Sequence, residues 1–170
     1  MKRYLGLPKY HLGIIVLYAL LIPVLFVLVP GAFRYNFTSN RLGMIAAIVA
    51  FTLVAFFYFL RSRKIEKPGL RPGRAASAIL YGIAFALPEE IIFRGVIQGF
   101  FQAHLNTALA VLLSALIFGI AHLPNDRKLS LLAFLAGLPL GVIFALTNSL
   151  LIPTLLHALF VASLELFTRD

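Results

Sequence analysis

The stretch AASAILYGIAFALPEEIIFRGVIQGFF, residues Ala75–Phe101, decides the fold of this chain. It is longer than the roughly 20 apolar residues that a helix needs to cross the hydrocarbon core of a bilayer. Near its middle, however, it carries Glu89, Glu90 and Arg94. Ionisable side chains are costly at bilayer depth, so each of the three is a candidate for function as well as for packing.

The composition of the whole chain points to lipid as its main solvent. Of its 170 residues, 61% are hydrophobic and 12% are charged, whereas soluble domains usually carry about 25% charged residues. No long polar stretch is available for a second domain, so we expect residues 1–170 to form a single membrane domain. The absence of cysteine excludes disulfides, a thiolate nucleophile and cysteine-ligated zinc.

Apolar segments of a length suited to membrane helices recur along the chain. The first has a core longer than the roughly 7–15 residues of a signal peptide, and no small-residue cleavage site follows it, so we interpret it as a retained helix. The sequence therefore predicts an all-α, polytopic transmembrane helical bundle of about six spans. The predicted spans are Leu12–Val29, Leu42–Leu60, Ala75–Phe101, Thr107–Leu123, Leu129–Leu146 and Leu150–Phe167.

The basic residues predict the orientation of these spans, because loops rich in Lys and Arg remain on the cytoplasmic side. The opposite side holds only Arg34 and Arg41, so we expect both termini in the cytoplasm. The net charge of +9 lies beside hydrophobic runs, which indicates contact with anionic lipid headgroups and argues against nucleic acid as a partner. The basic residues predicted to be cytoplasmic are Lys2, Arg3, Lys9, Arg61, Arg63, Lys64, Lys67, Arg71, Arg74, Arg127, Lys128 and Arg169.

The charged residues of Ala75–Phe101 divide into a pair and a single carboxylate. On a helix, Glu90 and Arg94 are four residues apart and face each other, whereas Glu89 is turned away from Arg94 by about 140°. An unpaired carboxylate suits a general base. Pro88 fits the first turn of a helix, so the chain can kink or restart there and bring helix N-terminal amides close to Glu89. The structural alternative is a buried Glu90–Arg94 ion pair with Glu89 facing a water-filled crevice.

Two histidines occur in other predicted spans. His122 ends its span, and by itself it is better explained as a capping or interfacial residue. His157 has no polar neighbour within its span except Thr154, one turn earlier, and so needs a partner from another span. The cost of burying polar groups in lipid favours a fold that gathers Glu89, His122 and His157 at one place.

The depths of these residues present a difficulty for that prediction. Glu89 lies about 20 Å along its span from the cytoplasmic start, at 1.5 Å per residue, whereas His122 lies near the cytoplasmic end of its own span. The two can meet if Ala75–Phe101 begins with an interfacial or bent piece, or if the span of His122 continues beyond it. We expect a water-accessible cavity that opens to the cytoplasmic half of the membrane.

Three short motifs resemble those of the CAAX proteases and bacteriocin-processing enzymes, the CPBP or Abi family of intramembrane glutamate proteases. The family's motifs are E-E-x-x-x-R, F-x-x-x-H and H-x-x-x-N on successive membrane helices. The first is present as Glu89-Glu90-Ile-Ile-Phe-Arg94, and the second as Phe118-Gly-Ile-Ala-His122. The third begins at His157 but has Val161 in place of asparagine. The resemblance covers residues 75–167, which would form the protease core.

The resemblance implies a metal-free endopeptidase in which Glu89 and His122 activate water and the site around His157 stabilises the oxyanion. Glu90 and Arg94 would support the site, and Phe118 would pack beside it. Valine at position 161 cannot donate a hydrogen bond, and loss of one oxyanion donor typically costs about 100- to 1000-fold in rate. Either another donor substitutes, for which Thr154 is a candidate, or the enzyme is weak or inactive.

Other functions use the same residues. Glu89, His122 and His157 are also a possible zinc-binding set, although the usual short-spaced His-x-x-x-His is missing. A transporter could use them as a proton relay, and a pseudoprotease could bind a membrane partner without cutting it. For the favoured protease, the substrate is a protein or peptide in or at the membrane. We expect the chain to be an integral protein of a prokaryotic cytoplasmic membrane.

Overall fold

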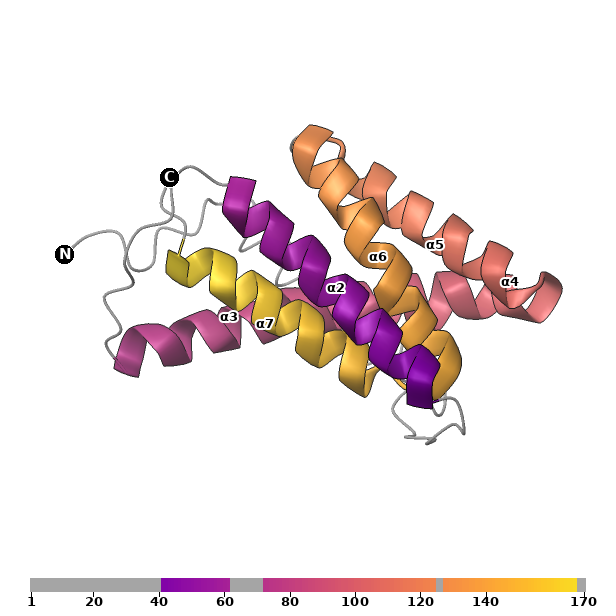
Figure 1. Cartoon of the computed structure of the whole chain (residues 1–170), viewed down its shortest axis with the longest axis horizontal. Helices are drawn as coiled ribbons and strands as arrows, with labels where there is room; N and C mark the ends of the chain where they lie inside the picture. Colours follow the sequence, from indigo (N-terminus) through magenta and orange to yellow (C-terminus); the bar gives the residue numbers. More distant parts are fainter. Residues whose placement is uncertain (1–40, 62–71, 125–126, 168–170) are drawn as a thin grey trace.

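The computed structural model describes residues 41–61, 72–124 and 127–167 (Figure 1). These residues form helices, without any strand among them. The predicted first span, Leu12–Val29, and most of the basic residues used for orientation lie outside the described residues. The elements are α2 (Arg41–Arg61), α3 (Pro72–Glu90), a π-helical segment η1 (Ile91–Gln98), α4 (Gly99–His104), α5 (Thr107–His122), α6 (Arg127–Thr147) and α7 (Leu151–Phe167).

Each of the five predicted spans from Leu42 onward coincides with a helix, within a few residues at either end. Two helices of the described residues, Gly73–His104 and Arg127–Thr147, are long and apolar enough to cross a membrane. Three shorter apolar helices accompany them, at Ile45–Phe57, Thr107–His122 and Leu151–Leu166. The all-helical, apolar architecture is therefore present, whereas the count of six spans and the orientation of the termini stay predictions.

The long helix does not restart at Pro88, which excludes the restart that was one of the two predicted possibilities. Pro88 lies inside α3, and helical structure continues through η1 into α4. Proline has no backbone N–H, so the carbonyl of Ala84 loses its usual helical donor. Three residues later the helix changes to the wider π form, which is rare and often found at functional sites. Helix N-terminal amides are consequently not placed beside Glu89.

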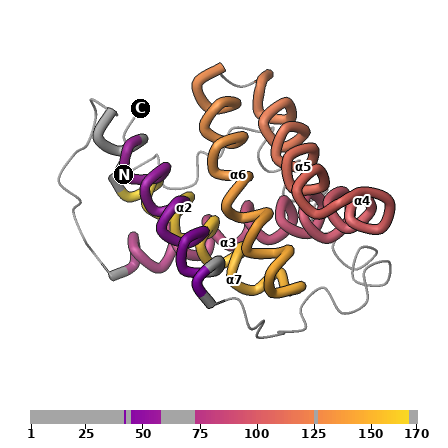
Figure 2. The backbone as a smooth tube through the Cα atoms, turned by 45° about the vertical axis from the view of Figure 1, so that its right-hand side comes forward, coloured from indigo at the N-terminus to yellow at the C-terminus, as the bar shows by residue number. Residues whose placement is uncertain are grey.

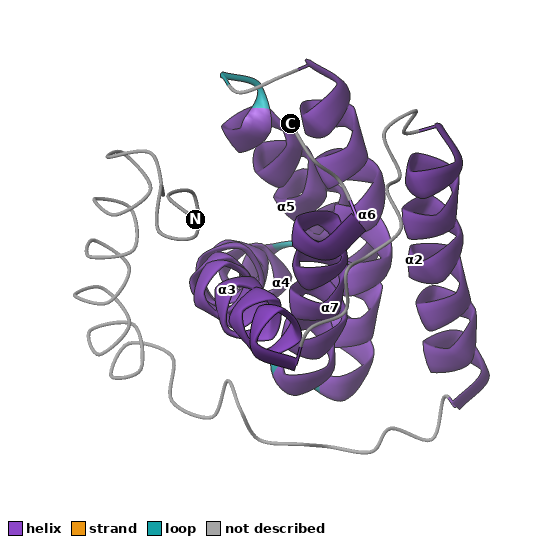
Figure 3. Ribbon diagram, turned by 90° about the vertical axis from the view of Figure 1, so that its left-hand side faces the viewer, coloured by secondary structure: helices purple, strands orange, loops and turns teal. Residues whose placement is uncertain are grey.

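The helices pack mainly as two pairs, α3 with α7 and α5 with α6. Figure 3 views α3 nearly along its axis while α5 and α6 stand upright, so the long helix crosses this second pair steeply. The helix α2 lies at the outer edge against α6 (Figures 2 and 3). Glycine allows the close approach in both pairs, because a Cβ at Gly82 would collide with the backbone carbonyl of Ala158, and one at Gly137 would lie 3.2 Å from the Cβ of Ala115.

The turn between α4 and α5 resolves the difficulty of depth. Leu105 ends α4 in an extended conformation, and Asn106 caps α5 by accepting a hydrogen bond from the backbone N–H of Leu109 at 3.0 Å. Residues that lie the same number of residues before and after this turn then meet, as Glu89 and His122 do. The helix α5 ends at His122 and does not continue past it. The hairpin register, not an extension of α5, places His122 beside Glu89.

Polar side chains of η1 and α5 hold the π-helical segment between its neighbours. Arg94 Nη2 donates to the carbonyl of Gly137 at 3.3 Å, and one turn later Gln98 Nε2 donates to the carbonyl of Gly141 at 2.8 Å. On the other side, Ser114 Oγ donates to the carbonyl of Phe93 at 2.6 Å. These bonds join η1 to both α5 and α6. They fix the rotation of the helix that carries the two glutamates.

Candidate active site

Glu89 lies between the two histidines that the sequence singled out. One of its carboxylate oxygens is 3.9 Å from Nε2 of His122, and the other is 3.7 Å from Nε2 of His157. These separations are too long for direct hydrogen bonds, and a water placed to one side can contact both partners at about 2.8 Å. The side chain of Glu89 is 15% exposed and that of His122 is 18% exposed. The structure thus gathers residues from α3, α5 and α7 around one place that water can reach.

The opposite ring nitrogens fix the orientation of both imidazoles. His122 Nδ1 lies 2.9 Å from the carbonyl of Phe118, and His157 Nδ1 lies 2.8 Å from Oε1 of Glu90. A carbonyl and a carboxylate oxygen accept hydrogen bonds, so Nδ1 is the donor in each ring. In the neutral form of either histidine, Nε2 is then an acceptor. Both Nε2 atoms face Glu89.

Glu90 has surroundings quite different from those of its neighbour Glu89. It is fully buried, and its Oε2 lies 3.2 Å from Nε of Arg94, the partner that the four-residue spacing predicted. These two atoms form an ion pair whose alignment falls short of a hydrogen bond. The other oxygen of Glu90 binds His157. Glu90 therefore links the buried charge of Arg94 to the orientation of the histidine, a contact that sequence analysis did not anticipate.

Phe118 lies at the centre of the site. Its ring centroid is 4.6 Å from that of His122 and 5.8 Å from that of His157, with edge-to-face geometry in both contacts. The guanidinium carbon of Arg94 lies 4.6 Å from the same centroid, a cation–π distance. Phe118 is 2% exposed. One aromatic ring thus contacts both imidazoles and the buried cation, as the predicted packing role requires.

A cavity of about 170 Å³ opens beside these groups. Among the described residues, the polar side chains that line it are Tyr81, Glu89, His122 and His157. Val161 also lines it, so the position where the family motif has asparagine does face the site. The remaining lining residues are apolar, namely Phe51, Phe85, Phe118, Leu129, Leu132, Ala133, Ala136, Leu140, Phe160 and Leu164.

Two residues of the site differ from what the sequence suggested. Thr154 is buried outside this lining, and its hydroxyl has no hydrogen-bond partner within the described part of the chain. The geometry therefore gives no support to Thr154 as a replacement oxyanion donor. Tyr81, by contrast, was missed. The signal was available, because Tyr81, Phe85 and Glu89 are spaced four apart and share one face of a helix.

The zinc alternative stays a prediction. In the ranges that the structure describes, no group of three or more His, Cys, Asp or Glu side chains is arranged so that it could hold a metal ion. Two nitrogens and a carboxylate are a suitable donor set in type. Hydrogen bonds hold both Nδ1 atoms, which is also usual for histidines that bind zinc through Nε2, and each Nε2 lies against a different oxygen of Glu89.

Comparison with known families gives a match. A model of the family described as type II CAAX prenyl endopeptidase, Rce1-like, matches residues 71–163. This range is more than half of the chain and nearly coincides with the predicted core, residues 75–167. It contains the two complete motifs with Glu89 and His122, and the incomplete third motif that begins at His157. Comparison with curated proteins and with solved structures finds no match.

Proposed function

The chain belongs to the Rce1-like family of type II CAAX prenyl endopeptidases, and from this premise we propose that Glu89 activates the water with which it cleaves a peptide bond. The substrate is a protein or peptide in or at the membrane. The observation that carries the proposal is the position of the Glu89 carboxylate, between the Nε2 atoms of His122 and His157 and at the wall of a cavity.

The number of hydrogen-bond donors and acceptors around the water assigns the roles of the two histidines. Glu89 and the two Nε2 atoms are three acceptors, whereas one water has two protons to donate. One further proton on these groups turns one of the three acceptors into a donor. Its positive charge, together with that of Arg94, also balances the negative charges of Glu89 and Glu90 in a medium of low dielectric. We place this proton on His157, because its Nδ1 already donates to Glu90. His157 Nε2 then donates as well, and His122 Nε2 accepts.

Hydrolysis follows from this arrangement without a covalent intermediate. Glu89 takes a proton from the water while the water oxygen bonds to the carbonyl carbon of the substrate. His157 Nε2–H donates to the carbonyl oxygen as negative charge develops on it. Glu89 then delivers its proton to the amide nitrogen, and the carbon–nitrogen bond breaks. His122 holds the water through Nε2, and Glu90 with Arg94 holds His157 in place.

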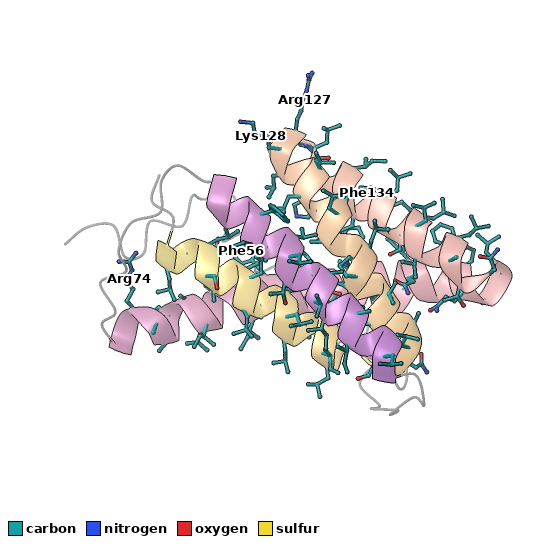
Figure 4. All side chains as sticks on the ribbon, in the orientation of Figure 1. Phe56, Arg74, Arg127, Lys128 and Phe134 are labelled. Atoms are coloured by element: carbon teal, nitrogen blue, oxygen red, sulfur yellow. The ribbon has the colours of Figure 1, made fainter. Side chains whose placement is uncertain are left out.

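The cavity is proposed to face the cytoplasmic side of a prokaryotic membrane. The ends predicted to be cytoplasmic, namely those of α2, α5 and α7 and the starts of α3 and α6, lie toward the left or upper edge of Figure 1. Figure 4 shows Arg74 near the start of α3, and Arg127 with Lys128 at the start of α6. These positions suit contact with anionic headgroups. The start of α2 and the end of α4 lie toward the right or lower right.

Purified protein in proteoliposomes tests the function. The first probe is a fluorogenic peptide ending in a prenylated CAAX sequence, the substrate class in the family's description. We expect Glu89→Gln to lower cleavage by about 100- to 10,000-fold, the contribution of a general acid–base group. Glu165→Gln, an exposed carboxylate on the same helix as His157, is the matched control and should cleave normally.

The same vesicles separate the rival functions. A proton relay predicts Glu89-dependent proton flux without cleavage, and a pseudoprotease predicts binding of the peptide by both forms without cleavage. Metal-free chemistry predicts that dialysis against a chelator leaves the rate unchanged and that elemental analysis finds no stoichiometric zinc. Loss of activity on chelation, restored by zinc, would overturn the metal-free mechanism while leaving the protease function standing.

A further inference from the structure

The cavity lies along the packed pair of α3 and α7, which run in opposite directions, and residues of α2, α5 and α6 line its other sides. Glu90 binds His157 near one end of this pair, and Arg74 Nη2 donates to the carbonyl of Leu166 at 3.4 Å near the other. This pairing brings residues of the two helices to similar heights along the cavity in three levels, one helical turn apart. The levels are Glu89 with His157, Phe85 with Val161, and Tyr81 with Leu164, all of which line the cavity.

The three levels differ in polarity. Glu89 and His157 supply donors and acceptors at the first level, whereas Phe85 and Val161 supply none at the second. At the third level the phenol of Tyr81 can both donate and accept. A peptide lying along the cavity carries backbone N–H and C=O groups, which are costly to bury without partners. Tyr81 is the side chain of the cavity lining, within the described residues, that can meet this need away from the catalytic groups.

The distance between the two polar levels defines what Tyr81 can contact. Eight residues of helix separate Tyr81 from Glu89, which amounts to about 12 Å. Both side chains lean toward the N-terminus of the helix, so their separation stays near this value and the phenol does not reach the scissile carbonyl. An extended chain covers about 3.3–3.6 Å per residue, so 12 Å corresponds to about three or four residues.

We propose that the Tyr81 hydroxyl is a substrate-binding group that hydrogen-bonds the backbone of an extended peptide three or four residues from the scissile bond. The proposal rests on the proposed peptidase function and deepens it, because it requires a substrate that lies along α3 and α7. Tyr81 sets specificity and affinity, whereas the reacting atoms remain with Glu89 and His157.

The test is Tyr81→Phe, assayed in proteoliposomes on a series of prenylated fluorogenic peptides. Phenylalanine keeps the ring contact with Phe85, whose centroid is 4.5 Å away, so the fold should be retained, and a thermal unfolding curve checks this. In the series, single backbone amides are replaced by esters at successive positions on either side of the scissile bond, and one peptide carries an amidated C-terminus. An ester is a weaker acceptor and lacks the N–H.

We expect Tyr81→Phe to lower kcat/KM for the parent peptide about three- to tenfold, mostly through KM, as loss of one neutral hydrogen bond does. When the backbone change lies three or four residues from the scissile bond, Tyr81→Phe and wild type should have the same kcat/KM for that peptide. Changes nearer the bond should leave that difference intact. The control Ser163→Ala removes a hydroxyl of α7 that donates to its own helix at the carbonyl of Leu159, and it should behave as wild type.

Two results would overturn the inference. One is an unchanged kcat/KM for Tyr81→Phe, and the other is a loss that is the same for every peptide of the series. Either can occur while Glu89→Gln remains inactive, in which case only the role of Tyr81 fails. If Glu89→Gln cleaves as fast as wild type, the proposed function fails first.

Discussion

Glu89 and Glu90 are neighbours in the chain, yet they belong to two different regions of the molecule. Glu90 faces a dry interior with Arg94 and Gln98, where each side chain is at most 1% exposed. Glu89 faces the cavity, is 15% exposed, and has both imidazoles just beyond hydrogen-bonding distance. A rotation of about 100° around one helix separates the two environments.

These two environments show how a helix can hold a reactive carboxylate in an apolar protein. The buried face supplies rigidity, since Glu90, Arg94 and Gln98 bind partners on α7 and α6. The open face keeps Glu89 without a direct bond, which leaves its lone pairs available to water. His157 joins the two regions, because one ring nitrogen binds Glu90 and the other faces Glu89.

The largest effect that separates the regions is expected from Glu90→Gln. Removal of this charge leaves Arg94 buried without its counter-charge, which typically costs about 3–5 kcal/mol of folding free energy. Glu89→Gln should change stability by less than about 1 kcal/mol, because its carboxylate is partly exposed and makes no direct hydrogen bond. Thermal or denaturant unfolding in the same detergent measures both. Equal losses of stability in the two variants would contradict the division into two regions.

A gain of function is expected from Val161→Asn on the open face. Val161 lines the cavity one turn after His157, so an asparagine amide there can add a donor for the oxyanion. Removal of one such donor from an optimised site lowers the rate about 100- to 1000-fold. We expect its addition here to raise kcat by a smaller factor, about 10- to 100-fold. Val161→Leu is the control for side-chain volume. No gain over that control would mean that the missing asparagine does not limit the rate.

The smallest effect is expected from Gln98→Leu on the buried face. Its amide nitrogen donates to the carbonyl of Gly141, but its Oε1 is buried without a partner in the described part of the chain. Leucine loses the hydrogen bond and also removes the unpaired oxygen, so the two terms nearly cancel. Stability should change by less than about 1 kcal/mol and kcat by less than about threefold. A loss as large as that of Glu90→Gln would show that neutral hydrogen bonds, more than buried charge, hold η1.

Much of this arrangement was predictable from local patterns. Apolar length predicted each described helix, and the four-residue spacing of Glu90 and Arg94 predicted their pairing. The position of His122 was also within reach, because it lies as far after the turn at Leu105 and Asn106 as Glu89 lies before it. This symmetry about the turn does not show when the depth of each residue is counted from the cytoplasmic end of its own span.

Other features depend on contacts between helices that are distant in sequence. The bond from His157 to Glu90 requires a particular rotation of α7 against α3, which the backbone contact at Gly82 permits. In the π-helical segment after Pro88, Arg94 and Gln98 bind carbonyls of α6, and no local propensity indicates these contacts. The burial of Thr154 outside the cavity has the same origin, since one turn of helix was not enough to predict which side of His157 faces the cavity.

The central claim is that Glu89, His122 and His157 share one water, and an experimental structure that resolves ordered solvent tests it most directly. We expect a single water within about 3 Å of the Glu89 carboxylate and of at least one Nε2 atom, with Nδ1 of His157 bonded to Glu90. A metal ion at that position, or imidazoles turned away so that no single water reaches Glu89 and a ring nitrogen together, would contradict it.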